Sequence, residues 1–349
     1  MNSRERVRTA LSHETPDRPP IFATFVPETE VRLRQITGID EPDLGVALGN
    51  DMVKACAGLE TSFYYRDDAE YTCPWGIGWR RVPNATGAYM EIVHHPLAGD
   101  QSKLDGFSIP DPTEPHHYAA VEEALRCYGT SKWIIGSCQI SIFEAAWYLR
   151  GMDQVMMDMI TDPDYVHALM DKVMEFPRVA CRRFIELGVD MVWLGDDVAG
   201  QQGMLLSPEL WRTFLKPRYA RLFAEFKELN PDIRIAYHSC GNCMAVLEEL
   251  ADIGLDVINP IQPAALDPAT VKQRFGKRLT LFGGLDVQHL MPFGTPDEVK
   301  RKVVELCEVC GRDGGYILAP AHHIQSDTPT RNIMALYEAG SRTETFCLP

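Results

Sequence analysis

Two stretches rich in histidine and cysteine carry the side chains best suited to chemistry. His238 and Cys240 end a short apolar run, and they would share one face of the expected strand because side chains two apart on a strand point the same way. Further along the chain, His322 and His323 follow a second apolar run, 316–319. A catalytic zinc site uses such ligands, three from the protein, and keeps a fourth position open. We therefore expect His238, Cys240 and His322 to bind zinc, with His323 as the alternative third ligand.

Other interpretations of these residues stay open. His238 and Cys240 could be buried structural groups, with the two later histidines in a polar loop. Cys240 and Cys243 also match the Cys-x-x-Cys pattern of a redox pair. The expectation that Cys243 begins the next helix disfavours the redox pair.

Further polar side chains follow other apolar runs. Asp196 and Asp197 are adjacent acids at a strand end, where mutual repulsion would raise one pKa, and they are candidates to orient the substrate or serve as acid or base. Glu28 is a third catalytic candidate, although it could equally cap the helix that follows it. The expected substrate-binding residues are Gln139, Asn259, Gln262, Asp286 and Gln288.

The elements needed to bring these residues together are parallel strands that end at one rim. Eight runs read as strands, most of them continuously apolar, as strands covered on both faces should be. They are 21–26, 51–56, 133–138, 189–194, 233–238, 255–259, 279–284 and 315–319. Helical patterns separate them, including long ones over 163–187 and 208–229 and another over 243–253. Eight such units predict a TIM (β/α)₈ barrel, whose active site lies at the carboxyl ends of its strands.

The barrel is expected to form a single domain over 1–349, preceded by an amphipathic helix at 3–13. Residues 60–97 interrupt the alternation with short strand-like pieces and turns, which predicts a β-hairpin insertion that caps one end of the barrel. A doubly wound sheet is the competing fold, but no Gly-x-Gly-x-x-Gly follows the first strand.

Composition narrows the classes of partner. The 349 residues are 45% hydrophobic and carry a formal net charge of −15, which disfavours nucleic acid and anionic membranes. The amino terminus does not resemble a signal peptide, and no apolar run is long enough to span a bilayer. Ten scattered cysteines are typical of reduced thiols. We expect a cytoplasmic protein.

Several motifs together resemble the uroporphyrinogen decarboxylase superfamily, and more closely its branch of corrinoid-dependent (cobamide) methyltransferases. The motifs are His238-Ser-Cys-Gly241, Asn259-Pro-Ile-Gln262, Phe282-Gly-Gly-Leu-Asp-Val-Gln288 and Gly314-Gly-Tyr-Ile-Leu-Ala-Pro320. The resemblance covers nearly the whole chain and itself implies a TIM barrel. It also implies a zinc site made by a His-x-Cys pair, matched here by His238 and Cys240, and a later cysteine.

This chain departs from the family pattern at two places. The decarboxylases have an arginine-rich stretch after the first strand that holds the acidic porphyrin, whereas residues 25–30 here contain no arginine. The position of the later cysteine is occupied by His322. A neutral imidazole in place of a thiolate leaves the metal site one unit more positive, and so a stronger Lewis acid.

The resemblance therefore predicts a zinc-dependent methyltransferase, of the demethylase type, that moves a methyl group between a small methoxy, alcohol or amine compound and a corrinoid. The corrinoid is expected on a partner protein, since no Asp-x-His-x-x-Gly signature occurs here. The alternatives are a decarboxylase-like lyase acting on a smaller carboxylic acid, and a methylcobamide:thiol methyltransferase. A homodimer is compatible with the sequence.

Overall fold

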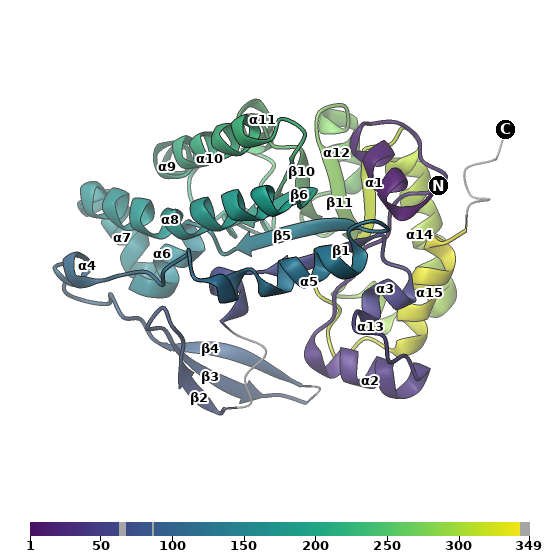
Figure 1. Ribbon diagram of the computed structural model, residues 1–349, viewed down its shortest axis with the longest axis horizontal. Coiled ribbons are helices and arrows are strands. Elements are labelled where there is room, and N and C mark those ends of the chain that lie inside the picture. The colour runs from purple at the N-terminus through teal and green to yellow at the C-terminus, as the bar shows by residue number, and fades with distance from the viewer. Residues whose placement is uncertain (63–67, 86, 343–349) are drawn as a thin grey trace.

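A curled sheet of seven parallel strands forms the centre of the molecule, with helices around its outer face (Figure 1). The computed structural model describes residues 1–62, 68–85 and 87–342. In their order across the sheet, the strands are β1 (Met52–Cys56), β5 (Trp133–Gln139), β6 (Met191–Gly195), β9 (Arg234–His238), β10 (Val257–Ile261), β11 (Thr280–Leu285) and β12 (Tyr316–Pro320). Each lies within a few residues of an expected strand, and the arrangement is that of a TIM-like barrel.

The expected first strand, 21–26, is not a regular strand. It makes isolated parallel bridges, Ile21 to Leu318 and Phe25 to Ile324. On its other side, the amide of Ala23 donates to Asn50 Oδ1 (2.9 Å) and Asn50 Nδ2 donates to the carbonyl of Ala23 (2.9 Å). The segment therefore lies between β12 and the approach to β1. On the side facing β1, the side-chain amide of Asn50 takes the place of backbone-to-backbone hydrogen bonds. The prediction of a regular eighth strand was therefore wrong.

The inside of the barrel is filled by alternate residues of the strands. One buried cluster contains, among others, Met52, Trp133, Ile135, Met191, Trp193, Ala236, Val257 and Phe282. Because alternate residues of a strand share a face, the residue two places further on also points inward, nearer the carboxyl end. Lys54, His238 and Asn259 reach the interior in this way, just above the apolar floor.

Helices cover the outer face of the sheet. The longer ones are α1 (Ser3–Leu11), α2 (Pro27–Thr37), α5 (Ala119–Tyr128), α6 (Phe143–Arg150), α7 (Met152–Thr161), α8 (Pro163–Leu187), α9 (Pro208–Phe214), α10 (Lys216–Leu229), α11 (Leu247–Asp252), α12 (Pro268–Phe275), α14 (Pro296–Gly311) and α15 (Thr330–Gly340). The helix expected over 208–229 is divided in two, because Pro217 at the start of α10 has no amide N–H with which to continue α9. In the described part of the chain, no helix is both long enough and apolar enough to cross a membrane.

Further differences concern short elements. The helices α3 (Leu44–Leu48), α4 (Lys103–Gly106) and α13 (Leu290–Phe293), the 3₁₀ turn η1 (Gly58–Thr61), and the strand pair β7 (Ala199–Gly200) and β8 (Gly203–Met204) were not expected. A helix was expected over 115–129, and its first residues form the 3₁₀ turn η2 (Pro115–His117) before α5. The helix expected over 243–253 begins only at Leu247. Before it, Asn242 Oδ1 accepts from the amide of Met244 (3.2 Å), which holds a local turn instead.

The insertion is a three-stranded antiparallel sheet and not a hairpin. It comprises β2 (Glu70–Thr72), β3 (Gly78–Pro83) and β4 (Ala88–His94); residues 63–67 and 86 of the expected 60–97 segment lie outside the described residues. Figure 1 shows this sheet projecting from the barrel beside α6, with its β3–β4 end directed towards α2. Trp79 of β3 is buried against Tyr148 of α6, with ring centroids 5.7 Å apart.

Candidate active site

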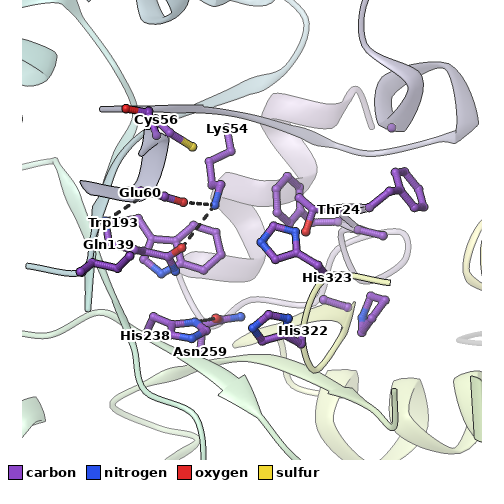
Figure 2. A pocket seen from close by; sticks show the side chains of 18 of the residues that line it. Thr24, Lys54, Cys56, Glu60, Gln139, Trp193, His238, Asn259, His322 and His323 are labelled. Carbon is purple, nitrogen blue, oxygen red and sulfur yellow. Dashed lines mark hydrogen bonds and ion pairs between the residues drawn. The ribbon is translucent and has the colours of Figure 1, made fainter. Parts of the chain in front are cut away.

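Three side chains with metal-binding atoms converge at the carboxyl ends of β9 and β12. The ligand atoms of His238, Cys240 and His322 all lie within 4.8 Å of one another. His238 is the last residue of β9, Cys240 follows it by two residues, and His322 lies just after β12. Figure 2 shows the His238 and His322 rings on the same side of the cavity, and their centroids are 6.2 Å apart. The strands of a curled sheet thus bring together residues more than eighty positions apart in the chain.

His238 is held in the orientation that a metal ligand requires. Its Nδ1 lies 2.7 Å from Asn259 Oδ1, while Asn259 Nδ2 donates to the carbonyl of Phe282 (3.4 Å). The amide oxygen of Asn259 is therefore the acceptor, and Nδ1 of His238 carries the proton. Nε2 keeps its lone pair, and it lies 3.5 Å from Cys240 Sγ. A hydrogen bond from the second ring nitrogen is the usual support of a metal-bound histidine.

The backbone around Cys240 is also fixed. Its amide donates to Asp197 Oδ1 (2.7 Å), and the amide of Gly241 donates to Gln262 Oε1 (3.0 Å). Gly241 has φ +82°, and a Cβ there would come within 2.5 Å of the carbonyl oxygen of Gly200. Only glycine fits this position, so the turn that directs Cys240 towards His238 depends on it.

The protonation of the two later histidines suits ligands. Burial, and secondarily the neighbouring His238, lowers the pKa of His322 to about 4, although one side of its ring borders the open cavity. Burial lowers the pKa of His323 well below its usual value. Both are neutral at neutral pH, but among the described residues the cluster includes His322 and not His323. Burial raises the pKa of the Cys240 thiol, and metal binding to a thiol removes that proton outright.

A cavity of about 560 Å³ opens in front of this cluster. Phe22, Trp193 and Phe282 form its aromatic floor, with Trp193 and Phe282 ring centroids 5.1 Å apart. Trp79, Tyr89 and Met90 of the insertion line its outer part. Five acidic side chains also line it: Glu30, Asp43, Glu60, Glu144 and Asp197. A cavity of this volume suits a small substrate with an apolar part.

One wall of the cavity carries a buried ion pair, the Lys54–Glu60 pair. Lys54 Nζ donates to Glu60 Oε1 and to Gln139 Oε1 (3.3 Å), and it lies 5.0 Å from the Trp193 ring centroid (Figure 2). Glu60 Oε2 accepts from the Ser137 hydroxyl and from the amide of Gln139 (3.2 Å). Burial opposes ionisation of Glu60, but Lys54 and these donors lower its pKa below the usual value. Both side chains of this pair are therefore charged, and both have hydrogen-bond partners.

A second wall is built from carboxyl groups that follow β6 and begin α6. Asp196 is fully buried, and its carboxylate accepts from the amides of Ile142 (3.0 Å) and Glu144 (2.9 Å) and from the Tyr219 hydroxyl. Burial raises the pKa of Asp196 to about 6. Glu144 Oε2 in turn accepts from the amide of Asp197 (3.0 Å). Hydrogen bonds to backbone amides therefore link the three acids to one another, and the carboxylate of Asp197 links them to the amide of Cys240.

The sequence matches the family model for uroporphyrinogen decarboxylase (URO-D) over residues 2–342. The chain belongs to the URO-D family.

Relatives within the URO-D family include two kinds of enzyme. Uroporphyrinogen decarboxylase from Crocosphaera subtropica is 28% identical over 259 residues, which are 72% of this chain and 70% of that protein. Methylcobamide:CoM methyltransferase MtbA from Methanosarcina acetivorans is 26% identical over 239 residues, 68% of this chain and 67% of its own. Methylated-thiol–coenzyme M methyltransferase from Methanosarcina mazei is 28% identical over 204 residues, 58% of this chain and 51% of its own.

A solved structure confirms the architecture. The structure of a methyltransferase from Methanosarcina mazei superposes with a TM-score of 0.75 and 22% sequence identity, covering 97% of this chain and 98% of the other. Identity this low supports the fold and nothing finer. The α/β barrel expected from the URO-D resemblance therefore agrees with an independent structure.

The remaining sequence candidates of this URO-D member differ in how they lie relative to the cavity. Gln139, Asn259 and Asp197 line the cavity, whereas Asp196 is buried behind it. Gln262 supports the turn after Cys240. The other three candidates, Glu28, Asp286 and Gln288, do not line the cavity.

The three outlying candidates contact other parts of the protein. Glu28 lies 3.5 Å from Arg81 of the insertion. Asp286 Oδ1 accepts from the amide of Gln288 (2.7 Å) and thereby holds the turn after β11. Gln288 Oε1 accepts from Gln201 Nε2 (3.2 Å).

Sequence reasoning missed three cavity residues, Lys54, Glu60 and Glu144. A signal existed for Lys54, because a lysine in the middle of an apolar strand must point into the barrel or against a helix. Glu60 lies four residues beyond β1 and Glu144 five residues beyond β5, where an acid is as easily a helix cap. Their inward direction depends on the turns that follow β1 and β5.

Proposed function

We propose that this protein is a zinc-dependent methyltransferase that moves a methyl group between a small methylated compound (a methoxy, alcohol or amine compound) and a corrinoid carried by a partner protein. The observation that supports the proposal is the His238–Cys240–His322 cluster at the edge of a small cavity. Two URO-D relatives named as methyltransferases, one of them for methylcobamide, support the reaction class.

The donor set fits zinc. One thiol and two imidazoles are ligands that zinc prefers, and three protein ligands leave one position for a substrate atom. The Asn259 hydrogen bond supplies the outer support expected for such a site. A bound zinc ion would act as a Lewis acid on the oxygen or nitrogen that carries the methyl group. The protein's own side chains position the substrate on the aromatic floor and exclude water from it.

Porphyrin decarboxylation is the alternative that the family allows, and the cavity lining disfavours it. Among the described residues that line the cavity none is arginine, and Lys54, the one lysine, is paired with Glu60. Five acidic side chains lie around the same space. A substrate with several carboxylates would meet repulsion here without the bidentate arginine contacts that bind such groups.

The test combines metal analysis with methyl transfer. Purified wild-type protein is expected to hold one zinc ion per chain, and H238A is expected to lose both zinc and methyl transfer, followed by the absorbance of a corrinoid partner protein. C243A is the matched control, because Cys243 belongs to the same Cys-x-x-Cys motif but lies outside the cluster. Wild-type protein that binds no zinc, or an H238A variant as active as wild type, would contradict the proposal.

A further inference from the structure

Glu144 is a buried carboxyl group that borders the cavity with acids beside it. It lies in the first turn of α6, is 8% exposed and lines the same space as His238. Asp196 and Asp197 are acidic neighbours whose charges act on it, and among the described residues no basic side chain forms an ion pair with it. Glu60, at the other wall, has Lys54. A buried acid without a cation, at the edge of a cavity, is typical of a functional group.

The position of Glu144 is set from both sides. Asp196 accepts from the backbone amide of Glu144 (2.9 Å), which fixes the start of α6. Glu144 Oε2 accepts from the amide of Asp197 (3.0 Å). One carboxyl oxygen is thus committed to the protein, and the group is held rigidly at the cavity while the other oxygen is left for a proton.

The surroundings favour the neutral acid. Burial raises the pKa of Glu144 well above its usual value, and the charges of Asp197 and Asp196 raise it further, with a smaller contribution from Glu60. Two tyrosines that pack against Asp196, Tyr219 and Tyr237, also have raised pKa values and stay uncharged. These surroundings favour the protonated form of Glu144, which has a proton to donate, as carboxylic acids kept in apolar sites do in other enzymes.

We propose that Glu144 is the proton donor to the heteroatom from which the methyl group leaves, and that the methyl donor is accordingly one with a poor leaving group, such as an alkyl or aryl methyl ether. The inference rests on the proposed methyl transfer. The methyl carbon bonds to the Co(I) corrinoid, and the carbon–oxygen bond breaks with its electron pair remaining on oxygen. That oxygen takes the proton of Glu144, which becomes a carboxylate and regains a proton from water.

A first experiment needs no turnover. The infrared difference spectrum between wild-type protein and E144Q at neutral pH is expected to show the carbonyl band of a protonated carboxylic acid. The amide of glutamine still accepts from Asp197, so the fold around it is kept. The matched variant E60Q is expected to remove carboxylate bands instead. Only carboxylate bands in the E144Q difference spectrum would overturn the role of Glu144, whatever the protein's activity.

A second experiment uses the leaving group. With a plain aryl methyl ether as donor, E144Q is expected to transfer methyl about 10²–10⁴-fold more slowly than wild type, the usual contribution of a general acid. With a nitro-substituted aryl methyl ether, whose phenolate leaves without a proton, the same variant is expected to stay within a few-fold of wild type. E60Q, in contrast, should slow both donors by one common factor, because Glu60 only positions Lys54.

The outcomes separate the two proposals. An equal loss for both donors in E144Q would make Glu144 a positioning residue and overturn the proton-donor role. Wild-type protein that transfers methyl from neither ether would overturn the ether as the methyl donor, whereas the proposed function is overturned only by the absence of zinc or by an H238A variant as active as wild type. A protonated Glu144 in the infrared spectrum would then still stand as a property of the chain.

Discussion

Glu60 and Glu144 are two glutamates buried at the same cavity, and their surroundings drive them to opposite states. Glu60 has Lys54 beside it and accepts from Ser137, so its pKa is lowered despite burial. Glu144 has carboxylates beside it, and its pKa is raised well above the usual value. Burial is the largest influence on both carboxyl groups, and it raises the pKa of each. The difference therefore comes from the neighbouring charge.

One barrel can thus hold an ionised acid and a neutral acid at the ends of neighbouring strands, since Glu60 follows β1 and Glu144 follows β5. An ionised wall attracts and positions a hydrogen-bond donor or a cation such as Lys54, whereas a neutral wall can release a proton. Exposure alone would not distinguish the walls, because both side chains are largely hidden from solvent.

The largest expected effect comes from breaking the ionised wall. Lys54→Met keeps the length of the side chain but leaves the charge of Glu60 buried without its cation. We expect the free energy of unfolding to fall by about 3–5 kcal/mol, the loss found when one partner of a buried pair is removed. Denaturant unfolding at neutral pH measures it.

The double variant K54M/E60Q is the control for that loss. It removes both charges, so most of the lost stability should return. A double variant as unstable as K54M would mean that Lys54 acts through packing on Trp193 and not through Glu60.

The pH dependence of stability gives the second test, with opposite signs for the two glutamates. The folded pKa of Glu144 lies above its ordinary value of 4.5, so folding retains a proton that the unfolded chain releases, and wild type loses stability as pH rises above about 4.5. E144Q lacks this loss. Its stability relative to wild type should therefore grow by up to about 1.4 kcal/mol per pH unit, until the folded pKa is passed.

Glu60 should show the reverse behaviour. Its folded pKa lies below 4.5, so its contribution is complete above about 4.5 and is lost as pH falls through the folded pKa. The deficit of E60Q relative to wild type should thus be constant from pH 5 to pH 8. Parallel curves for E60Q and E144Q over that range would show that the two walls do not differ in charge.

The smallest effect on stability is expected from substitution of Glu28, whose ion pair with Arg81 lies outside the barrel. Glu28 and Arg81 are 35% and 43% exposed, so water screens the attraction between α2 and the insertion. Glu28→Gln should change the free energy of unfolding by about 0.5 kcal/mol or less. A loss of several kcal/mol would mean that the insertion is held in place chiefly by this contact.

The parts of the site that the sequence could predict depend on short-range regularity. His238 and Cys240 were expected to lie together because they end an apolar run, where alternation fixes a common face. His322 was expected beside them because it follows another such run and parallel strands end at one rim, and the structure does bring the three side chains together. The preference for His322 over His323 could only be stated as an alternative, since the direction of a loop residue depends on contacts far away in the chain.

The parts that could not be predicted depend on turns and on side chains that replace backbone. The strand pairing of residues 21–26 is interrupted because the side chain of Asn50 hydrogen-bonds to the backbone of Ala23. No pattern in either segment predicts that a side chain replaces a backbone partner. Asp286 seemed suited to the rim, but its carboxylate is used by the amide of Gln288. Glu144 was overlooked because an acid in the first turn of a helix is common for reasons unrelated to chemistry.

The insertion separates the outer part of the cavity from the rest of the site along the chain. Trp79, Tyr89 and Met90 reach the cavity from one continuous stretch that leaves the barrel after β1 and returns before β5, while the atoms of the His238–Cys240–His322 cluster come from strand ends much later in the chain. A change confined to that single stretch would remodel the outer part of the cavity and leave the cluster untouched. Substrate preference can thus be altered through the insertion without rebuilding the strands of the barrel.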